Sequence, residues 1–549
     1  MVPFSAYMRR YSFLSGAVFI VIISALVGGV YGRSLLETQN RLSRSLRIFT
    51  SALAAVQDNY VEELESERLV YGAVRGVVQT LDPHSSFMDP KSYAQLRERQ
   101  EGRYYGLGIT ITVINGDITV VALFEGSPAY RQGIRRGDVI ARIEGESASD
   151  WTSDQAVKVL RGPRGSSVKI SIRRQGYEEL VELEVERDEI QIPTILGSFM
   201  LKDSTAYIRL RDFSEITDRD LYDELKKLSE QGMQRLLLDL RDNPGGPLDQ
   251  AIRVANRFLE RGDLIVYTRG RVQNADQDYR ATKKSEFSDL LLIVLVNRNS
   301  ASASEIVAGA IQDHDRGLIV GETTFGKALV QSIYRISHGA GLALTTARYY
   351  TPSGRLIQRP WDGTFDEYLT YSLRDQSDEL PRSNEQLKYT DAGRKVFGGG
   401  GIQPDHPKTG PIEGFNPTKF GRLLYARQLF ATYAQKFSIE NDTRFGMDAT
   451  DRELLDQDFI VDTDMVKDFF DFVRSQRVKI DMQLAKEDDV FIRTMIRYDI
   501  DLALFGVKEA RRRMIAEDPQ AKFALSLFSE AEKLTKKVAE GLGSPVGVN

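Results

Sequence analysis

Residues 291–313 read L-L-I-V-L-V-N-R-N-S-A-S-A-S-E-I-V-A-G-A-I-Q-D, an apolar run followed by a polar turn and a stretch of small and apolar residues. This order predicts a β-strand that leads through a serine-rich turn into a helix, the repeating unit of an α/β domain. Three serines compete at the turn, namely Ser300, Ser302 and Ser304. A serine at the start of a helix lies at the positive end of the helix dipole. Ser304, followed by Glu305, also has the composition of a helix cap, so this turn alone favours capping over catalysis.

The alternation of strands and helices extends over residues 188–410 and predicts an α/β core with a mixed sheet and flanking helices. The expected strands are 206–210, 235–240, 291–296 and 318–320, and the expected helices are 218–231, 248–260 and 304–312.

One of these strands belongs to the segment L-L-L-D-L-R-D-N-P-G-G at 236–246 and runs into two glycines. Gly245 and Gly246 permit backbone conformations that expose an N–H group to a ligand. A rigidly placed N–H donor suits the oxyanion of a tetrahedral intermediate. An ordinary strand-to-helix turn explains the segment equally well. Asp239 and Asp242 make only a weak metal site, since no histidine cluster accompanies them.

The segment G-E-T-T-F-G-K at 321–327 fits the phosphate-binding pattern G-x-x-x-x-G-K, but its surroundings argue against that function. Ala328 stands where a metal-binding Ser or Thr is needed, and the chain continues as a strand rather than a helix. Read as a strand, Lys327, Leu329 and Gln331 project to one face. A lysine held among apolar neighbours loses solvation and becomes able to take a proton from a serine. Gln331 would orient the amine by hydrogen bonding.

A lysine base matters because serine is a poor nucleophile at neutral pH without a base beside it. The chain has four histidines, and one of them, His84, lies beside Pro83 in the segment L-D-P-H-S-S-F-M-D-P at 81–90. A histidine in such a turn is typical of a structural hydrogen-bonding role. We therefore expect Lys327 to be the base if a serine is catalytic.

Residues 103–187 contain short strands separated by glycine turns. The G-L-G-I turn, the S-P-A helix start, the G-I-R-R-G-D-V-I run and the R-G-P-R-G turn together resemble a PDZ domain. By this resemblance, the loop at Tyr105, Gly106, Leu107 and Gly108 presents backbone N–H groups to a terminal carboxylate, and an extended peptide adds to the exposed sheet edge. A small β-domain whose glycines only make turns is the alternative.

The segments S-A-S-A-S-E-I and G-E-T-T-F-G-K-A-L-V-Q, in this order, resemble the carboxyl-terminal processing peptidases, which are serine proteases with a Ser-Lys-Gln site. Further matches are L-D-P-H-S-S-F, the PDZ-like insert, D-L-R-D-N-P-G-G and G-G-I-Q-P-D, so that the resemblance spans about residues 37–410. It implies Ser302 as nucleophile, Lys327 as general base and Gln331 as orienting residue. It also implies an oxyanion hole made by the backbone amides of Gly246 and Ala303.

The chain departs from the family at Pro247, which follows the implied oxyanion glycine, and at Ala328, where a glycine is expected. Neither departure removes a catalytic group. Residues 411–549 lie outside the resemblance, and their charged, amphipathic pattern predicts a helical extension. A solvated helical cap is the expectation for this extension, and an oligomerisation element is the alternative.

Residues 13–32 form an uncharged apolar run of the length that spans a bilayer as a helix. Arg9 and Arg10 precede this run, which keeps the short N-terminus in the cytoplasm and places the rest of the chain outside it. We therefore expect residues 1–36 to be a retained single-pass anchor in the inner membrane, followed by a helical region at 37–102. The catalytic part would lie on the periplasmic, extracytoplasmic side. A cleaved signal peptide is the rival interpretation.

Composition agrees with a folded protein of several domains, since 42% of the 549 residues are hydrophobic and 28% are charged. The net charge of −5 argues against broad nucleic-acid binding. Disulfides and thiolate metal sites are excluded because the chain has no cysteine.

The expected function is tail-specific proteolysis of envelope proteins. A serine endopeptidase would capture protein C-termini through its PDZ domain and hydrolyse peptide bonds by a Ser-Lys mechanism, with no metal or organic cofactor. The rival from another class is a non-catalytic scaffold that holds envelope proteins through the PDZ domain. A homo-oligomer and an adaptor or activator protein are left open as further partners.

Overall fold

The computed structural model describes residues 43–114, 116–124, 126–174, 176–361, 368, 386–408, 417–440 and 452–540. The chain divides into two compact units, residues 1–89 and 90–549, which are described in turn. The predicted membrane anchor at 1–36 lies outside the described residues. Within the described ranges, no helix combines the length and the apolar character that a bilayer crossing requires.

In the first unit, a helix over residues 43–59 precedes α2 (Ser66–Gln79) and the short strand β1 (Ser86–Met88). Asp82 organises the turn between α2 and β1, because its carboxylate accepts hydrogen bonds from the backbone N–H groups of His84 and Ser85, both at 2.8 Å. These bonds hold the His84 backbone in the turn, and the structural role of its imidazole stays a prediction.

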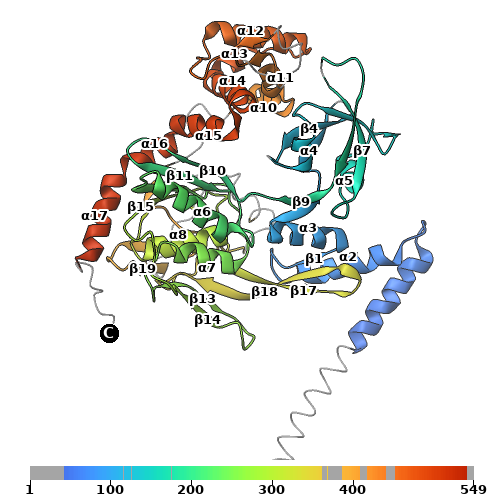
Figure 1. Ribbon diagram of the computed structural model, residues 1–549. Helices are drawn as coiled ribbons and strands as arrows, with labels where there is room; N and C mark the ends of the chain where they lie inside the picture. The colour runs from blue at the N-terminus through green and yellow to red at the C-terminus, as the bar shows by residue number, and fades with distance from the viewer. Residues whose placement is uncertain are drawn as a thin grey trace, which may run out of the picture. The chain divides into compact units, whose positions relative to one another are not determined.

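The second unit begins with α3 (Pro90–Glu101), after which the chain enters a β-domain through β2 (Arg103–Gly106) and leaves it through β9 (Asp188–Gln191). These two strands pair antiparallel, so the domain is an insert whose ends lie side by side (Figure 1). Its antiparallel sheet has the order β3-β4-β5-β7-β8, with β6 beside β5. The strands are β3 (Ile109–Ile114), β4 (Asp117–Leu123), β5 (Val139–Ile143), β6 (Glu146–Ser147), β7 (Ser167–Arg173) and β8 (Val181–Glu186).

Two helices accompany the inserted sheet, α4 (Pro128–Arg131) and α5 (Ser153–Leu160). Helix α5 begins at a capping box, in which Thr152 and Gln155 each bond the backbone N–H of the other with a side-chain oxygen. Helix α5 also contacts β3, which is an end strand of the sheet. Among the described residues β4 is the one partner strand of β3, so the other edge of β3 is open to an added strand.

The core is a six-stranded sheet with the order β10-β11-β12-β15-β16-β21. Strand β10 pairs antiparallel with β11, and the other neighbours pair parallel, so the sheet is mixed as predicted. The strands are β10 (Ile195–Met200), β11 (Thr205–Leu210), β12 (Arg235–Asp239), β15 (Leu291–Val296), β16 (Leu318–Gly321) and β21 (His406–Pro407). The four strands expected from the sequence are β11, β12, β15 and β16.

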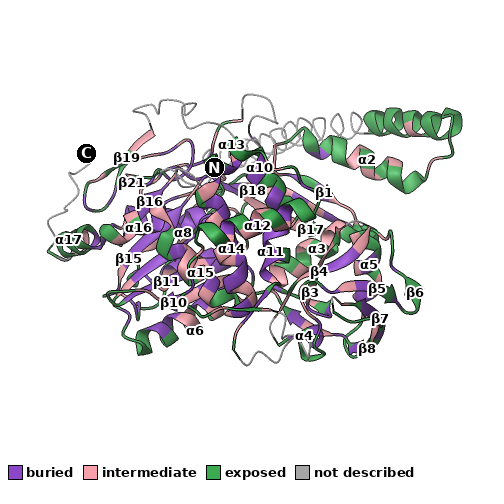
Figure 2. Ribbon diagram, turned by 90° about the horizontal axis from the view of Figure 1, so that it is seen from above, coloured by how far each residue is buried: buried purple, intermediate pink, exposed green. Residues whose placement is uncertain are grey.

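Both faces of this sheet are covered, because alternate residues of its strands divide between two apolar clusters (Figure 2). Leu236, Leu238 and Val294 pack with α6, α7 and α8. Leu237 and Ile293 pack instead with α16 and α17. The helices are α6 (Thr217–Glu230), α7 (Leu248–Asn256), α8 (Ala303–Asp313), α16 (Pro519–Ser526) and α17 (Phe528–Ala539).

Helix α7 ends at Asn256, before the expected residue 260. The chain tightens there, since the backbone N–H of Phe258 bonds to the carbonyl oxygen of Ala255, and Phe258 turns into the core.

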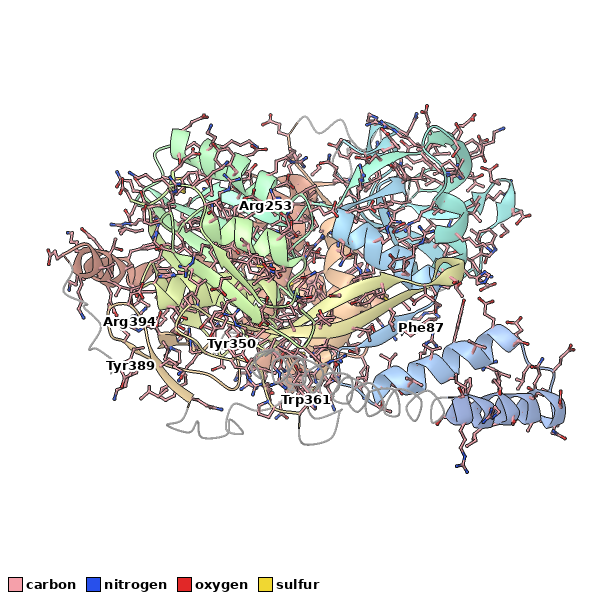
Figure 3. The ribbon with its side chains drawn as sticks, turned by 90° about the horizontal axis from the view of Figure 1, so that it is seen from below. Phe87, Arg253, Tyr350, Trp361, Tyr389 and Arg394 are labelled. Carbon is pink, nitrogen blue, oxygen red and sulfur yellow. The ribbon has the colours of Figure 1, made fainter. Side chains whose placement is uncertain are left out.

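A second, antiparallel sheet of the same unit contains β14, β13, β18 and β17 in this order. The strands are β13 (Leu264–Arg269), β14 (Gln277–Arg280), β17 (Leu329–Arg335) and β18 (Gly341–Tyr350). Tyr350, labelled in Figure 3, stacks on Tyr267 with ring centroids 5.0 Å apart. Strand β18 thereby joins β17, which follows Lys327, to β13. A separate short pair is formed by β19 (Leu387–Tyr389) and β20 (Lys395–Phe397).

The helical extension has two parts. Its first part has a core of its own, in which Phe430 stacks on Phe469 with ring centroids 5.0 Å apart. This part contains α10 (Lys419–Ala426), α11 (Leu429–Ala434), α12 (Thr463–Ser475), α13 (Met482–Glu487), α14 (Asp489–Leu504) and the parallel pair β22 (Phe437–Ser438) and β23 (Glu453–Leu454). Helix α15 (Gly506–Glu517) then leads to α16 and α17 on the core sheet. The extension is therefore not a solvated cap alone, since its last two helices bury one face of the sheet.

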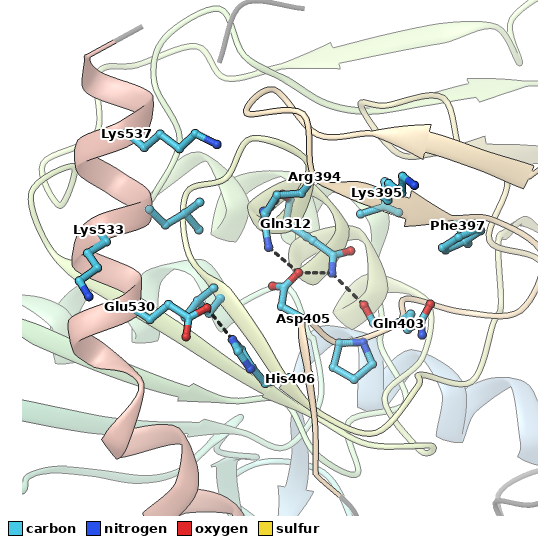
Figure 4. A pocket seen from close by; sticks show the side chains of 14 residues that line it. Gln312, Arg394, Lys395, Phe397, Gln403, Asp405, His406, Glu530, Lys533 and Lys537 are labelled. Atoms are coloured by element: carbon cyan, nitrogen blue, oxygen red, sulfur yellow. Dashed lines mark hydrogen bonds and ion pairs between the residues drawn. The ribbon is translucent and has the colours of Figure 1, made fainter. Parts of the chain in front are cut away.

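A hollow of about 520 Å³ marks the seam between α17 and the core (Figure 4). Across it, His406 Nε2 lies 2.9 Å from Glu530 Oε1. Asp405 accepts hydrogen bonds from Gln312 (3.0 Å) and Arg394 (2.5 Å). These polar groups bond to one another, and the contact between His406 and Glu530 ties α17 to the core. None of the predicted catalytic residues is among the described residues that line the hollow.

Candidate active site

Ser302 lies between β15 and α8, at the carboxyl end of the parallel strands, where α/β folds place their ligands. Its backbone has φ 55° and ψ −112°. A positive φ costs a residue with a side chain about 1–3 kcal/mol, and such strain clusters at active sites. A serine on a sharp strand-to-helix turn is typical of a nucleophile that the turn exposes.

Hydrogen bonding separates the three candidate serines. The Ser300 hydroxyl is buried and donates to the carbonyl oxygen of Leu240 at 2.8 Å. The Ser304 hydroxyl is buried and donates to the carbonyl oxygen of Asn243 at 3.0 Å. The expectation that Ser304 caps the helix is wrong, because α8 begins at Ala303 and Ser304 lies inside it. Only Ser302 is partly exposed, so geometry favours it as the reactive hydroxyl.

Glu305 ties Ser302 to Lys327. One carboxylate oxygen, Oε2, accepts the backbone N–H groups of Ser302 (2.8 Å) and Lys327 (2.9 Å). The other oxygen accepts the Thr324 hydroxyl (2.5 Å) and the Gly326 N–H (2.7 Å). Glu305 is fully buried, and burial raises the pKa of its carboxyl above the usual range, although the four hydrogen bonds act in the opposite direction. A single side chain thus holds the serine turn against the lysine loop.

Tyr349 of β18 reinforces the same junction. Its buried hydroxyl lies 2.5 Å from the carbonyl oxygen of Lys327 and 3.2 Å from that of Ser302. The backbones of both residues are therefore held on the N–H side by Glu305 and on the carbonyl side by Tyr349.

Lys327 itself does not lie on a regular strand. Strand β17 starts at Leu329, and its pairing with β18 is interrupted by a bulge between Val330 and Gln331. The period-two argument does not reach Lys327, because this residue lies before the strand, and a common face for Lys327 and Gln331 stays a prediction. The prediction that β17 is a strand and not the helix of a P-loop is confirmed. The Gln331 side chain donates to the Thr345 hydroxyl at 3.3 Å.

The glycine loop after β12 packs directly on the serine turn. A Cβ atom on Gly245 would lie 2.8 Å from both Ser302 Cβ and Ala303 N, so only glycine fits there, and its φ of 94° requires glycine as well. Asn243 joins the two segments: its side chain bonds the Gly245 N–H (2.9 Å), and its backbone carbonyl accepts the Ala301 N–H (3.0 Å).

Two backbone N–H groups in these loops have no hydrogen-bond acceptor among the described residues, those of Gly246 and Ala303. Their neighbours are occupied, since Ser302 N–H bonds Glu305 and the Ser304 N–H bonds the Ala301 carbonyl. Ala303 is fully buried, where a backbone donor without an acceptor is rare, whereas Gly246 is exposed. Both N–H groups suit a site that receives an oxyanion.

Asp239 and Asp242 are both engaged by protein donors, which disfavours the metal interpretation. Asp239 is fully buried, accepting the Tyr207 hydroxyl (2.7 Å) and pairing with Arg241 (2.7 Å). Burial raises the pKa of Asp239, but the Arg241 guanidinium outweighs it and leaves the pKa below its usual range. Asp242 accepts the side-chain amide of Asn297 at 2.8 Å.

The predicted peptide-binding loop begins inside β2, whose last two residues, Tyr105 and Gly106, pair with β9. Leu107, Gly106 and Gly108 are buried, whereas Tyr105 is exposed. The carbonyl oxygens of Leu107 and Gly108 accept hydrogen bonds from the N–H groups of Ala129 (3.0 Å) and Phe124 (2.9 Å), respectively. The N–H groups of Leu107 and Gly108 have no acceptor within the described part of the chain, which leaves them available for a carboxylate.

Sequence reasoning missed Glu305 and Tyr349 as parts of the site. Glu305 follows Ser302 by one helical turn, and a capping-box pattern S-x-x-E was the available signal. Tyr349 carried no signal, since only the pairing of β17 with β18 brings it to the Lys327 loop.

Comparison with known families supports this organisation. Residues 204–364 match peptidase family S41, residues 95–173 match the PDZ domain, and residues 33–92 match the N-terminal domain of the activating protease CtpB. The chain is 37% identical over 350 residues to a carboxy-terminal-processing protease of Bartonella bacilliformis, covering 63% of this chain and 79% of that protein. It is 32% identical over 355 residues to the carboxy-terminal processing protease CtpA of Bacillus subtilis, covering 62% and 74%.

Solved structures with similarity include a photosystem II D1 C-terminal processing protease, with 31% identity, a TM-score of 0.32 and coverage of 57% of this chain and 90% of that chain. The PDZ domain of a carboxy-terminal protease from Vibrio cholerae, in complex with peptide, has 26% identity and a TM-score of 0.15 and covers 16% of this chain and 98% of that chain.

Proposed function

This chain belongs to the S41 family of carboxy-terminal processing serine proteases, with a substrate-binding PDZ domain, and we propose that Ser302, Lys327 and Gln331 are its catalytic residues. The observation that carries the assignment is the Glu305 carboxylate, which holds the strained Ser302 and Lys327 by their backbone N–H groups. No other serine of the turn combines a partly exposed position with a link to the lysine loop.

In the proposed reaction, Ser302 Oγ attacks the scissile carbonyl carbon while Lys327 Nζ takes the hydroxyl proton. The developing oxyanion accepts hydrogen bonds from the Gly246 and Ala303 N–H groups, which support this role by having no acceptor among the described residues. Lys327 returns the proton to the leaving amine, and water then releases the acyl group from Ser302. Gln331 orients the amine.

The PDZ domain would select the substrate by its end. We place the substrate carboxylate at Tyr105, Gly106, Leu107 and Gly108 and the preceding residues as an added strand along β3, beside α5. Capture of the C-terminus raises the local concentration of the chain to be cleaved.

For the location, we propose that residues 1–36 anchor the protease in the inner membrane and that the described part faces the periplasm. The uncharged run at 13–32 supports this proposal. Envelope proteins with accessible C-termini would then be the substrate class.

The test is casein digestion by the purified full chain and by Ser302→Ala and Lys327→Ala. We expect both substitutions to reduce the rate by about a thousandfold or more, because members of one catalytic unit fail together. Ser229→Ala and Lys388→Ala, both at exposed positions, are the matched controls and should digest casein at the wild-type rate. Equal digestion by wild type and Ser302→Ala would show that the assigned site is wrong.

A further inference from the structure

The helical extension reaches the oxyanion loop through one buried arginine, and we propose that Asp518 and Gln520 are positioning residues for catalysis. They act through Arg241, which directly precedes the loop Asp242–Gly246. This inference rests on the proposed function, because it takes the Gly246 N–H as an oxyanion donor.

Arg241 is buried and is held from two sides. Its Nε and Nη2 atoms face Asp239 of the core sheet, the Nη2 distance being 2.7 Å. Its Nη1 atom lies 2.7 Å from Asp518 Oδ2 and 2.8 Å from Gln520 Oε1, both of the extension. Among the described residues, both partners of the Arg241 Nη1 atom therefore belong to the extension.

The geometry of α16 makes this contact rigid. Asp518 Oδ1 caps the helix by accepting the N–H groups of Gln520 (2.8 Å) and Ala521 (3.1 Å), while its Oδ2 faces Arg241. The Gln520 side-chain amide donates to the Lys408 carbonyl at 2.7 Å. Ala521 is fully buried against the sheet, so the cap cannot move without the helix.

Charge balance shows why a second carboxylate is needed. Two guanidiniums, those of Arg241 and Arg209, surround the single fully buried carboxylate of Asp239. Arg209 is also paired with Asp242 at 3.0 Å, and Asp518 provides the additional carboxylate for Arg241. Without Asp518, Arg241 has to share Asp239 with Arg209, and a buried cation that lacks its full complement of partners shifts its position.

A displacement of the Arg241 side chain would move the loop at 242–246, which follows it directly in the chain. Asp242 has a positive φ of 59° and is fixed by Asn297 and Asn299. Asn243 is bonded to the serine turn through the Ala301 N–H. This loop has few free torsions, so a shift at Arg241 changes where the Gly246 N–H points.

The measurable consequence is a loss in kcat without a change in KM, since an oxyanion donor acts in the transition state and not in substrate capture. Misplacing such a donor, rather than deleting it, is expected to lower kcat by about 10- to 100-fold.

The decisive variant is Asp518→Asn in the full chain. Asparagine caps a helix as well as aspartate does, so this change removes the charge facing Arg241 and keeps the cap of α16. Asp481→Asn is the matched control, because Asp481 caps α13 by accepting the Gln483 and Leu484 N–H groups and is exposed. The double variant Asp518→Asn with Gln520→Glu returns a carboxylate to the Nη1 arm of Arg241.

With a peptide substrate, we expect a lowered kcat for Asp518→Asn, a wild-type kcat for Asp481→Asn, and recovery to within about threefold of wild type in the double variant. Circular dichroism and binding of a C-terminal peptide to the PDZ domain establish that each variant is folded. If Asp518→Asn does not fold, Gln520→Leu provides the same kcat and KM comparison.

A wild-type kcat for Asp518→Asn, a change confined to KM, or no recovery in the double variant would each overturn the positioning role. Ser302→Ala, assayed in parallel, separates this result from the proposed function. Full activity of Ser302→Ala would refute the catalytic assignment itself, whereas an inactive Ser302→Ala beside an unaffected Asp518→Asn would refute only the role of the extension.

Discussion

Ser302 is held in a backbone conformation that its own side chain disfavours, with φ 55° and ψ −112°. Glycine adopts this region without the steric cost of a Cβ atom. We therefore expect Ser302→Gly to be more stable than Ser302→Ala by about 1 kcal/mol, although both remove the hydroxyl. Urea unfolding of the two inactive variants measures this difference. If Ser302→Ala equals or exceeds Ser302→Gly in stability, the turn is not strained.

Glu305 is the second residue on which the site depends, because its two carboxylate oxygens accept four hydrogen bonds. Glu305→Gln replaces one oxygen by an NH₂ group, which then faces N–H donors instead of accepting from them. We expect a loss of about 2–3 kcal/mol in unfolding free energy, together with a fall in kcat of about a hundredfold or more.

Thermal unfolding and peptide hydrolysis measure these two effects of Glu305→Gln. Glu230→Gln, at an exposed position in α6, is the control and should change neither. Wild-type kcat in Glu305→Gln would mean that the link between Ser302 and Lys327 is unimportant for the reaction.

At the residue scale, the sequence predicts which residues react. It does not predict which neighbouring groups hold those residues in place. Ser302 and Lys327 stand in motifs whose residue order is recognisable. Glu305 carries a capping-box signal, but its bond to the Lys327 N–H and the contact of Tyr349 with the Lys327 carbonyl arise only where α8, β18 and the Lys327 loop meet in the fold. The exclusion of Ser300 and Ser304 likewise depends on carbonyl oxygens of the neighbouring segment at 240–243.

Among the elements, α8 bears the serine turn at its start and His314 at its end. His314 Nδ1 lies 2.7 Å from Asp391 Oδ2, and its Nε2 lies 2.7 Å from the Leu264 carbonyl oxygen. Burial lowers the pKa of His314, but the hydrogen bonds to Asp391 and Leu264 outweigh it and raise the pKa from 6.5 to about 9. A cation at a helix C-terminus is also favoured by the helix dipole.

A raised histidine pKa means that the folded state binds the proton more tightly than the unfolded state does. The stabilisation is complete below pH 6.5 and is lost as the pH rises through about 9. We expect a loss of about 1–3 kcal/mol over this window, below the full linkage value because Asp391 is exposed to solvent. Urea unfolding between pH 6 and 9.5 tests this, with His314→Asn predicted to lack the slope.

His338→Asn is the comparison for His314→Asn, since His338 is exposed at a turn and should leave the slope unchanged. A wild-type pH dependence in His314→Asn would contradict the assignment of the effect to this helix end.

The elements also show where pattern reasoning succeeds and fails. Strands β11, β12, β15 and β16 were predictable because buried parallel strands are continuous apolar runs bounded by turns. The position of Lys327 was not, because β17 begins only at Leu329 and residues 322–328 form a loop whose path no periodic pattern specifies.

For the second unit as a whole, the extension is the feature that the sequence left undetermined. Its amphipathic helices could have been solvated or could have covered a partner, and amphipathicity does not specify which surface a helix covers. The structure shows that α16 and α17 cover the sheet face formed by residues such as Leu237 and Ile293. The extension contributes to the hydrophobic core of the protease, so removing it would expose an apolar sheet face.

An ion pair joins the same extension to the PDZ domain. Arg136, in the loop between α4 and β5, lies 3.1 Å from Asp499 of α14. Asp499 has only 8% of its side chain exposed, and burial raises the pKa of its carboxyl although Arg136 acts in the opposite direction. The neighbouring Gly137 packs against the end of the Gln435 side chain.

Arg136→Ala would leave the Asp499 carboxylate buried without its cation. We expect α14 to lose about 1–2 kcal/mol of local stability at pH 7, because an unpaired buried charge is costly even where its partner was partly exposed. Since the pKa of Asp499 rises in the folded state, ionisation opposes folding, and the deficit should become smaller as the pH falls and the carboxyl binds a proton. Hydrogen exchange of the α14 amides measures this local stability.

Arg164→Ala, which breaks the exposed pair with Asp188, is the control and should leave the stability of α14 unchanged. Equal exchange in wild type and Arg136→Ala at pH 7 would show that the ion pair does not hold the PDZ domain to the extension.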